Sequence, residues 1–262
     1  MITLITDFGT ADYFVGAMKG VILSINPHAR IVDITHEIPA FDIEAAAFTV
    51  LQTYKTFPAN TIHVAVVDPG VGSDRRPILV TTREQFLVGP DNGLFSYIYD
   101  REETGHIYHL TNQKYFRHPV SATFHGRDIF AAVAGALSIG VEPQLLGNEI
   151  NDMKRLASLG PTVSSPGTIE ARVIQIDRYG NCITNLTRDD LTDEMIASGA
   201  SLQIGSHEVT SFRRFFSESK GASGALFGFW GSSEFLEIAA FQTSAARLLG
   251  VERGQRVILT TF

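Results

Sequence analysis

Short β-branched runs alternate with segments of helical period along roughly the first 145 residues, and this alternation predicts an α/β domain. Helical segments are expected to begin near Asp12, Asp42 and Gly126. Because strands joined by crossover helices pair in parallel, we expect a mostly parallel, Rossmann-like sheet in a domain over residues 1–150. The expected strands are residues 2–6, 30–34, 61–67, 78–82 and 86–88.

The first predicted helix has one apolar face. Its apolar residues recur at helical spacing and are expected to pack against the sheet, so they are core residues and not site residues. They are Phe14, Met18, Val21, Ile22 and Ile25.

The pattern changes in the last third of the chain. Residues 147–167 are poorly patterned and end in Gly and Pro, which is typical of a linker. Beyond them, short apolar runs are separated by turn residues, with one helix near residues 189–198. Residues 168–262 are therefore expected to form a smaller antiparallel β-barrel or sandwich domain. The expected strands are residues 169–177, 202–204, 225–229, 235–240 and 257–261.

Composition and charge exclude several classes of protein. A chain of 262 residues with 44% hydrophobic content can bury a large and a smaller core. A net charge of -7 and no run of Lys or Arg disfavour nucleic acid and anionic membranes as partners. The single cysteine, Cys182, rules out an internal disulfide and is expected to be a buried side chain. With no signal peptide or membrane span recognised, we expect a cytoplasmic protein.

Polar residues follow several predicted strands, where open α/β sheets bind ligands. Asp7 and Asp12 follow the first strand, Asp68 and Arg75 follow the third, and His125 precedes the last helix of the domain. An acid, a guanidinium and an imidazole at converging strand ends predict a catalytic pocket.

Each of these residues also has a structural interpretation. Asp12 has roughly even odds of being a helix cap, and the segment Asp91-Asn92-Gly93 is better explained as a turn. An isolated His125 would more often be a partly buried imidazole, and an isolated Arg75 a solvated charge. Because the acid, the guanidinium and the imidazole occur together at strand ends, a catalytic site is the better explanation.

Three motifs do not support the functions they suggest. Asp7-Phe8-Gly9 lacks the other kinase motifs, and Gly70-Val71-Gly72 lacks the third glycine of a dinucleotide fingerprint. His106 and His109 have no carboxylate or thiolate at a metal-ligand spacing, so we expect no metal. In the second domain, residues 176–185 and 230–239 are explained locally as a hairpin and as a turn entering a core strand.

Taken together and in order, several motifs closely resemble the S-adenosylmethionine hydrolase family. This family is also called adenosylmethionine hydroxide adenosyltransferase and is related to fluorinases and chlorinases. The motifs are Thr6-Asp7-Phe8-Gly9, Val67-Asp68-Pro69-Gly70-Val71-Gly72 with Arg75, Gly89-Pro90-Asp91-Asn92-Gly93, His125-Gly126-Arg127-Asp128, Tyr179-Gly180-Asn181 and Ser232 with Leu236-Glu237-Ile238-Ala239.

The resemblance implies an α/β amino-terminal domain, a carboxyl-terminal β-barrel and a homotrimer with its sites at subunit interfaces. It also implies hydrolysis of S-adenosyl-L-methionine (SAM) to adenosine and L-methionine by in-line attack of water at ribose C5′, without a cofactor. In the first domain, Asp7 and Asp12 would hold the ribose, and Asp68, Arg75 and His125 would activate the water.

The resemblance extends to contacts in the second domain. There Asp177 would bind the methionine ammonium, Asn181 the adenine and Ser232 the methionine carboxylate. Phe41 and Phe212 fall where related enzymes place aromatic groups against the ligand, although either could be a core residue.

Two alternative functions are weighed against hydrolysis. Fluorinases carry tyrosine where this chain has Asp68 and serine where it has Gly126, and a carboxylate would repel a halide, so a SAM-dependent halogenase is disfavoured. A non-catalytic adenosine- or SAM-binding protein is disfavoured because binding alone does not need a water-activating set. The segment 231–234 departs from the family pattern, where Asn-Ser and a second glycine are usual.

Overall fold

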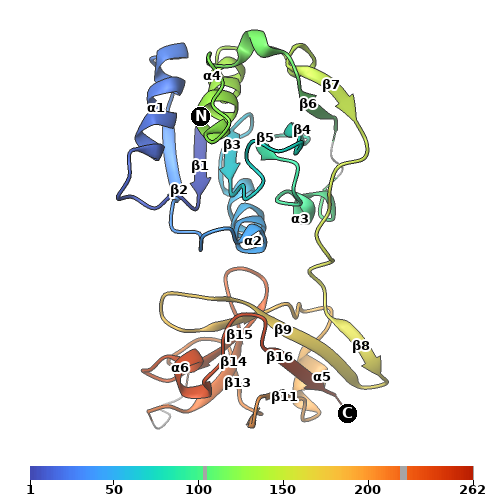
Figure 1. Cartoon of the computed structure of the whole chain (residues 1–262). Coiled ribbons are helices and arrows are strands. Elements are labelled where there is room, and N and C mark those ends of the chain that lie inside the picture. Colours follow the sequence, from blue (N-terminus) through green and yellow to red (C-terminus); the bar gives the residue numbers. More distant parts are fainter. Residues whose placement is uncertain (103–104, 219–222, 262) are drawn as a thin grey trace. The chain divides into compact units, whose positions relative to one another are not determined.

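The computed structural model describes residues 1–102, 105–218 and 223–261. The chain divides into two compact units, Met1–Ala157 and Ser158–Phe262 (Figure 1). Each unit has its own sheet and its own hydrophobic core.

The first unit is built on a seven-stranded sheet of order β2-β1-β3-β5-β4-β6-β7. Pairs β1–β2, β1–β3 and β3–β5 are parallel, whereas β5–β4, β4–β6 and β6–β7 are antiparallel. The sheet is therefore mixed, and the expectation of a mostly parallel sheet was wrong. The strands are β1 (Ile2–Thr6), β2 (Ile31–Thr35), β3 (Ile62–Val66), β4 (Pro77–Thr81), β5 (Phe86–Pro90), β6 (Ile107–Leu110) and β7 (Gly147–Ile150).

The physical reason for the mixed sheet lies in its connections. A parallel pair needs a crossover of a dozen or more residues, but β4 and β5 are joined by a tight turn in which Thr82 N–H donates to the Gln85 carbonyl at 2.9 Å. Such a short connection permits only antiparallel pairing.

Helices cover both faces of this sheet (Figure 1). On one face α1 (Phe14–Ile25) and α4 (Ala132–Ser138) share a core with β1 and β3, and on the other α2 (Ile43–Thr53) and α3 (Ser96–Tyr99) do so. The predicted apolar face of α1 is confirmed, because its central residues are buried and the terminal ones pack on the same core. A π-helix, η3 (Gly126–Ala131), leads directly into α4. The remaining short helices of this unit are η1 (Tyr54–Thr56), η2 (Gln113–Tyr115) and η4 (Pro143–Leu145).

The second unit contains a nine-stranded sheet that curls into a half-barrel. The pairing path runs β12-β11-β16-β9-β10-β15-β14-β13, with β8 also paired to β9. Among the described residues β12 and β13 end this path unpaired with each other, so the sheet is open and not a closed barrel. The pair β13–β14 is parallel, and the others are antiparallel.

The elements of the second unit follow the expected order. Two short helices, α5 (Asp193–Ala197) and α6 (Ala245–Leu249), accompany the sheet. Cys182 is fully buried, as expected, and burial raises the pKa of its thiol to about 11. The strands are β8 (Thr162–Ser165), β9 (Thr168–Ile176), β10 (Cys182–Thr184), β11 (Ser201–Ile204), β12 (His207–Val209), β13 (Phe212–Arg213), β14 (Leu226–Trp230), β15 (Leu236–Ala240) and β16 (Arg256–Thr260).

The segment 147–167, expected to be a linker, contains two strands. β7 pairs with β6, and β8 pairs with β9. Both are polar, and β8 is exposed along its whole length, so neither shows the apolar alternation that marks a half-buried strand.

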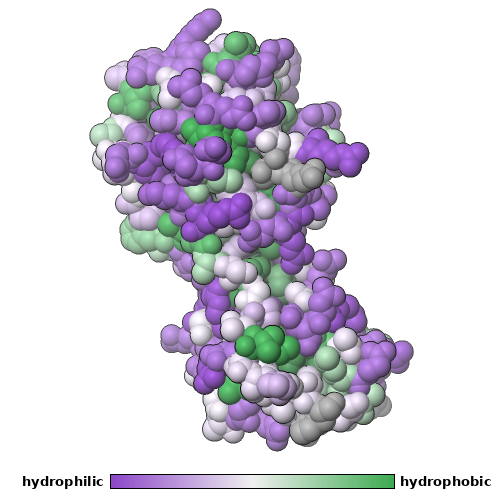
Figure 2. Space-filling view, turned by 90° about the vertical axis from the view of Figure 1, so that its right-hand side faces the viewer, coloured by the Kyte–Doolittle hydropathy of each residue, from purple (hydrophilic) through white to green (hydrophobic). Residues whose placement is uncertain are grey.

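No helix in the part of the chain that the structure describes is long and apolar enough to cross a membrane. The face seen in Figure 2 is mostly hydrophilic, with small separate apolar patches.

Candidate active site

The first candidate site lies where β1 and β3 end. These strands are parallel neighbours in which Thr6 is opposite Val66, so Asp7 and Asp68 emerge at the same edge of the sheet. Arg75 lies in the loop between β3 and β4, and His125 immediately precedes η3. The topology thus brings together residues that are more than a hundred positions apart in sequence.

Asp68, Arg75 and His125 are in direct contact. Arg75 Nε donates to Asp68 Oδ1 at 3.0 Å, and Arg75 Nη2 donates to Asp68 Oδ2. The same Nη2 lies 2.9 Å from His125 Nδ1. The side chains of Arg75 and Asp68 are only 4% and 5% exposed, so this bidentate ion pair is largely shielded from water. The structure therefore brings together the three residues grouped by the sequence analysis.

The contact with Arg75 fixes the proton on His125. A guanidinium has no acceptor, so Arg75 must donate and Nδ1 must accept. The imidazole is therefore neutral, with its hydrogen on Nε2. Burial and the adjacent Arg75 charge both lower the pKa of His125, which favours the same neutral form. His125 can consequently donate one hydrogen bond through Nε2.

The pKa of Asp68 is shifted in the opposite direction to that of His125. Burial raises the pKa of its carboxyl group, and the charge and hydrogen bonds of Arg75 oppose that rise. The result is a carboxylate held in one orientation that is more basic than an exposed aspartate.

A cavity of about 310 Å³ opens beside these residues. Arg75 does not line it and lies behind Asp68 and His125, with its guanidinium 5.4 Å from the centre of the Phe130 ring. The cavity is lined by Asp7, Phe8, Phe14, Ala40, Phe41, Val66, Asp68, Val71, Thr123, Phe124, His125 and Gly126.

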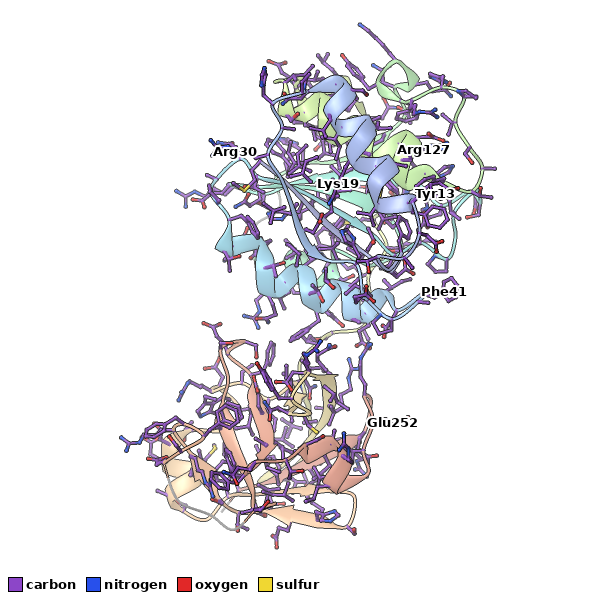
Figure 3. All side chains as sticks on the ribbon, turned by 90° about the vertical axis from the view of Figure 1, so that its left-hand side faces the viewer. Tyr13, Lys19, Arg30, Phe41, Arg127 and Glu252 are labelled. Atoms are coloured by element: carbon purple, nitrogen blue, oxygen red, sulfur yellow. The ribbon has the colours of Figure 1, made fainter. Side chains whose placement is uncertain are left out.

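Asp7 and Phe41 are joined at this cavity. Asp7 Oδ2 accepts a hydrogen bond of 2.9 Å from the backbone N–H of Phe41, and no contact of Oδ1 is seen within the described residues. Phe41 has a positive φ of 67°, is 72% exposed and projects outward from the loop before α2 (Figure 3). A bulky residue in the left-handed region is strained, and the bond to Asp7 helps hold it there.

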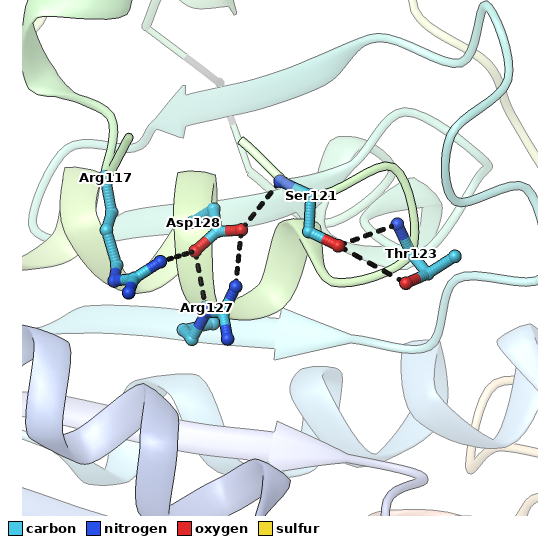
Figure 4. A network of polar contacts seen from close by, with 5 residues as sticks. All are labelled: Arg117, Ser121, Thr123, Arg127 and Asp128. Atoms are coloured by element: carbon cyan, nitrogen blue, oxygen red, sulfur yellow. Dashed lines mark hydrogen bonds and ion pairs between the residues drawn. The ribbon is translucent and has the colours of Figure 1, made fainter. Parts of the chain in front are cut away.

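The loop that carries His125 is clamped by Asp128, whose side chain is completely buried (Figure 4). Asp128 Oδ2 accepts from the Ser121 backbone N–H at 2.8 Å, while Arg117 and Arg127 donate to its other oxygen at 3.1 and 2.7 Å. Although burial alone would raise the pKa of Asp128, these hydrogen bonds lower it. Asp128 therefore orders the segment that leads into His125.

Asp12 is not brought to the cavity. It is exposed and is not among the lining residues. It does not cap α1 either, because the N-cap position is Tyr13 and has no side-chain cap. By contrast Asp42 caps α2, its Oδ1 accepting from Ala45 N–H at 3.0 Å.

The segment 91–93 is a turn, as expected. Asn92 Nδ2 donates to the Val67 carbonyl at 2.9 Å, and Gly93 has a φ of 98°. Arg76 is paired with buried Asp91 at 2.6 Å, so its charge has a structural role.

In the second unit, Asp177 and Asn181 form one compact turn between β9 and β10. Asp177 Oδ1 accepts from the backbone N–H groups of Tyr179 and Asn181 at 2.9 and 2.8 Å. Asn181 Nδ2 donates to Asp177 Oδ2 at 2.8 Å, and no described residue donates to the amide oxygen of Asn181, which can therefore accept a further hydrogen bond. Gly180, with a φ of 84°, makes the turn possible.

Asn181 lines a cavity of about 660 Å³ in the second unit. Tyr179 and Phe216 are exposed aromatic residues at this cavity, and sequence reasoning missed them as candidate ligand contacts. For Tyr179, the sequence signal that could have indicated a ligand contact is an aromatic residue next to the Gly180-Asn181 turn. The other lining residues are Ala240, Gln242, Thr243, Ser244 and Arg247.

Phe212 and Ser232 lie outside that cavity. Phe212 is half-buried on β13, where it packs against the core of the half-barrel and also lines a separate cavity of about 390 Å³. Ser232 is exposed on the turn between β14 and β15. Glu237 on β15, which the sequence analysis did not propose as a site residue, is buried, and burial followed by the charge of Asp177 raises its pKa to about 7.

Comparison with known proteins shows two family matches. Residues 2–147 match the SAM hydroxide adenosyltransferase N-terminal domain, and residues 171–258 match the C-terminal domain of the same family. A protein of Methanocaldococcus jannaschii named (R)-S-adenosyl-L-methionine hydrolase is 37% identical, over 96% of this chain and 92% of the relative. One of the same name from Thermus thermophilus is 34% identical, over 97% of both chains.

Other matches include halogenating enzymes and a solved structure. Proteins named fluorinase are more distant, such as one from an Actinoplanes strain at 26% identity over 81% of this chain and 80% of the relative. An uncharacterised Thermotoga maritima protein matches with a TM-score of 0.92 and 31% identity, over 99% of this chain and 100% of that one.

Proposed function

Because the chain belongs to the SAM hydroxide adenosyltransferase family, we propose that it hydrolyses S-adenosyl-L-methionine to adenosine and L-methionine. The contact between Asp68, Arg75 and His125 beside a cavity is the observation that carries the proposal. The enzyme is a hydrolase, and SAM is its substrate.

The reaction needs little help at the leaving group. Water attacks ribose C5′, the bond from C5′ to sulfur breaks, and its electron pair makes the sulfonium a neutral thioether. Because this leaving group takes no proton, neither a general acid nor a separate cofactor is required. Holding the water in line supplies on the order of 7 kcal/mol or more of the barrier reduction, and general-base assistance contributes a factor of about 10² to 10⁴.

The geometry favours distinct roles for Asp68 and His125. Because His125 Nδ1 accepts from Arg75, the imidazole can donate from Nε2 to a water oxygen but has no free acceptor for its proton. Asp68 lines the cavity, and burial raises its basicity, so we propose that Asp68 accepts the proton. Arg75 is a positioning residue that orients both partners.

The remaining predicted contacts divide between the two units. We propose that Asp7 Oδ1 accepts from the ribose hydroxyls, because Oδ2 is already bonded to Phe41. In the second unit, we propose that the free amide oxygen of Asn181 accepts from the exocyclic amine of adenine, and that Ser232 and Asp177 contact the amino-acid end. Phe41 lines the cavity beside Asp7 and is proposed to lie against the ligand, whereas Asp12, which lies outside the cavity, and Phe212, which packs against the core of the half-barrel, are weaker candidates. A homotrimer, expected from the family resemblance, is tested by sedimentation.

Incubation with SAM in ¹⁸O-labelled water tests the reaction. We expect adenosine carrying the label in its 5′ hydroxyl, together with unlabelled methionine. The sulfonium sulfur is stereogenic, and the curated relatives are named for the (R) form, so a mixture of sulfur epimers should lose the (R) form first. Formation of 5′-halogenated adenosine in chloride or fluoride would indicate a halogenase, and intact SAM would indicate a binding protein.

Asp7→Ala tests the ribose contact. We expect the Kd for adenosine to rise by about tenfold or more, because a charge-assisted hydrogen bond contributes roughly 1.5–3 kcal/mol. The loss of the bond to Phe41 adds to this effect by releasing its loop. Titration calorimetry measures the affinity, and Asp7→Asn, which keeps an acceptor for Phe41, serves as the matched control. Adenosine binding unchanged in Asp7→Ala would exclude the contact.

A further inference from the structure

The first unit has another cavity, of about 720 Å³, which we call the α1–α4 cavity. Residues of α1, of α4 and of the segment 114–117 line it, and it shares no lining residue with the cavity beside Asp68 and His125. Its volume is in the range of about 300–1,000 Å³ that small-molecule sites in proteins occupy. The proposed hydrolysis does not use this space.

Short side chains on the two helices leave the α1–α4 cavity open. Ala17 and Gly20 line it from α1, and Ala132 and Ala136 line it from α4. A Cβ at Gly20 would have no atom from elsewhere in the chain within 4 Å, so the hollow extends down to the backbone of α1.

Larger apolar side chains form the walls of this cavity. One of them, Ile139, is 57% exposed, and covering such a side chain with an apolar ligand is favourable. The other large aliphatic or phenyl side chains in the walls are Val21, Ile25, Phe116 and Val141.

Three cations line the same cavity, and none of its described lining residues is a carboxylate. Lys114 is exposed, and Arg117 and Arg127 belong to the clamp around Asp128 (Figure 4). Arg117 Nη1 and Arg127 Nε both donate to Asp128 Oδ1, so the two guanidinium groups are neighbours. Asp128 neutralises one of the three positive charges, which leaves an excess of two at the cavity.

The two arginines also keep hydrogen-bond donors that Asp128 does not use. A guanidinium has five N–H donors, but Asp128 accepts through one nitrogen of Arg117 and two nitrogens of Arg127. No other described residue accepts from either side chain. The side chains of Arg117 and Arg127 are 44% and 24% exposed, and Arg127 lies beside α1 (Figure 3), so a ligand in the cavity can reach the remaining donors.

We propose that the α1–α4 cavity binds an organic carboxylate with an aliphatic chain, whose chain lies between the two helices and whose carboxylate pairs with Arg117 and Arg127. Asp128 already shows that these two side chains can hold one carboxylate oxygen together. A small, wholly polar anion would leave the apolar walls uncovered, and an uncharged apolar molecule would leave the excess positive charge unpaired. The site is separate from the proposed hydrolysis, because the two cavities share no residue.

Titration calorimetry of the full chain with sodium octanoate at pH 7 tests the site. We expect octanoate to bind at least about tenfold more tightly than 1-octanol, because the alcohol lacks the charge that pairs with the arginines. Acetate keeps that charge but covers none of the apolar walls, so its affinity should also be at least about tenfold weaker. Saturating adenosine should leave the Kd of octanoate within about twofold of its value in the free protein, because different residues line the two cavities.

Gly20→Leu fills the cavity from its floor and should raise the Kd of octanoate by about tenfold or more, since the added side chain takes the place of the ligand chain. The variant should fold, because a Cβ at this position has room and leucine favours a helix more than glycine does. Gly16→Leu is the matched control. Gly16 is exposed on the same helix, its Cβ would also have room, and it does not line the cavity, so the wild-type affinity should be retained.

Lys114→Gln tests the contribution of charge without touching the clamp around Asp128. We expect the Kd of octanoate to rise about twofold to fivefold, the size of effect that an exposed charge has. Lys154→Gln removes another exposed lysine of the same unit that does not line the cavity, and it should leave the Kd unchanged.

Several results would overturn the inference. They are no binding of octanoate to the wild type, equally tight binding of octanol, competition by adenosine, and an unchanged Kd in Gly20→Leu. If Gly20→Leu dissociates a wild-type oligomer in sedimentation, the cavity is an interface with a second copy of the chain and not a carboxylate site. Should Gly20→Leu fail to melt cooperatively, the comparison of octanoate with octanol and the effect of Lys114→Gln decide the question. Intact SAM after incubation would refute the proposed function alone, because the octanoate titration does not depend on turnover.

Discussion

Replacing His125 with alanine is expected to lower kcat by about 10² to 10⁴ while leaving KM within a few-fold of the wild-type value. The variant loses the Nε2 donor proposed to orient the water, and Arg75 loses the acceptor that holds its Nη2. Asp7 and Asn181, the residues proposed to contact the ribose and the adenine, are untouched. Steady-state kinetics on SAM, with adenosine measured by chromatography, provides both parameters.

His28→Ala is the matched control, because His28 is exposed and far from η3 in sequence. It should retain wild-type kinetics and melting temperature. Full turnover by His125→Ala would remove the imidazole from the mechanism, and a large rise in KM at unchanged kcat would reassign it to substrate binding.

Replacing Arg75 with methionine is expected to destabilise the protein by roughly 3–5 kcal/mol, because it leaves Asp68 charged, buried and unpaired. The same change should abolish most of the activity, since both Asp68 and His125 lose their common partner. Thermal or urea unfolding measures the first effect, and adenosine formation measures the second. Arg30→Met, at an exposed arginine, controls for loss of a positive charge (Figure 3).

A second variant distinguishes the two effects of Arg75. Combining Arg75→Met with Asp68→Asn removes the unpaired charge, so most of the lost stability should return. Activity should stay absent, because the water then has neither a base nor an oriented imidazole. Recovery of activity along with stability would show that Arg75 and Asp68 serve the fold alone.

The strands and their order were largely predictable from the sequence, because buried strands such as β1 and β3 are short runs rich in β-branched residues that are followed by turn residues. What the sequence analysis missed are short or exposed elements. Examples are β8, which is polar throughout, and β12, a strand of three residues. Strand direction was wrong at β4 because the brevity of the connection to β5 was not weighed.

The residues around Asp68 were found because charged groups at strand ends are chemically conspicuous. Their positions after predicted strands grouped Asp68, Arg75 and His125, and the family resemblance then implied that they activate water. The local contacts of the acidic residues in the second unit were not predictable from the sequence. The saturation of Asp177 depends on how its own turn folds, and the burial of Glu237, which has no partner among the described residues, depends on which face of β15 it occupies between β10 and β14. A single sequence does not reveal which face of the strand carries Glu237.

The π-helical geometry of η3 limits which changes of chain length this enzyme can accept. Such a segment contains one residue more than the α-helical path it replaces. Deleting one of residues 126–131 is therefore expected to restore ordinary winding while the flanking residues keep their orientation. Inserting a residue instead would rotate everything before it by about 100° relative to α4 and turn the imidazole away from its arginine, so in this region a silent deletion should be commoner than a silent insertion.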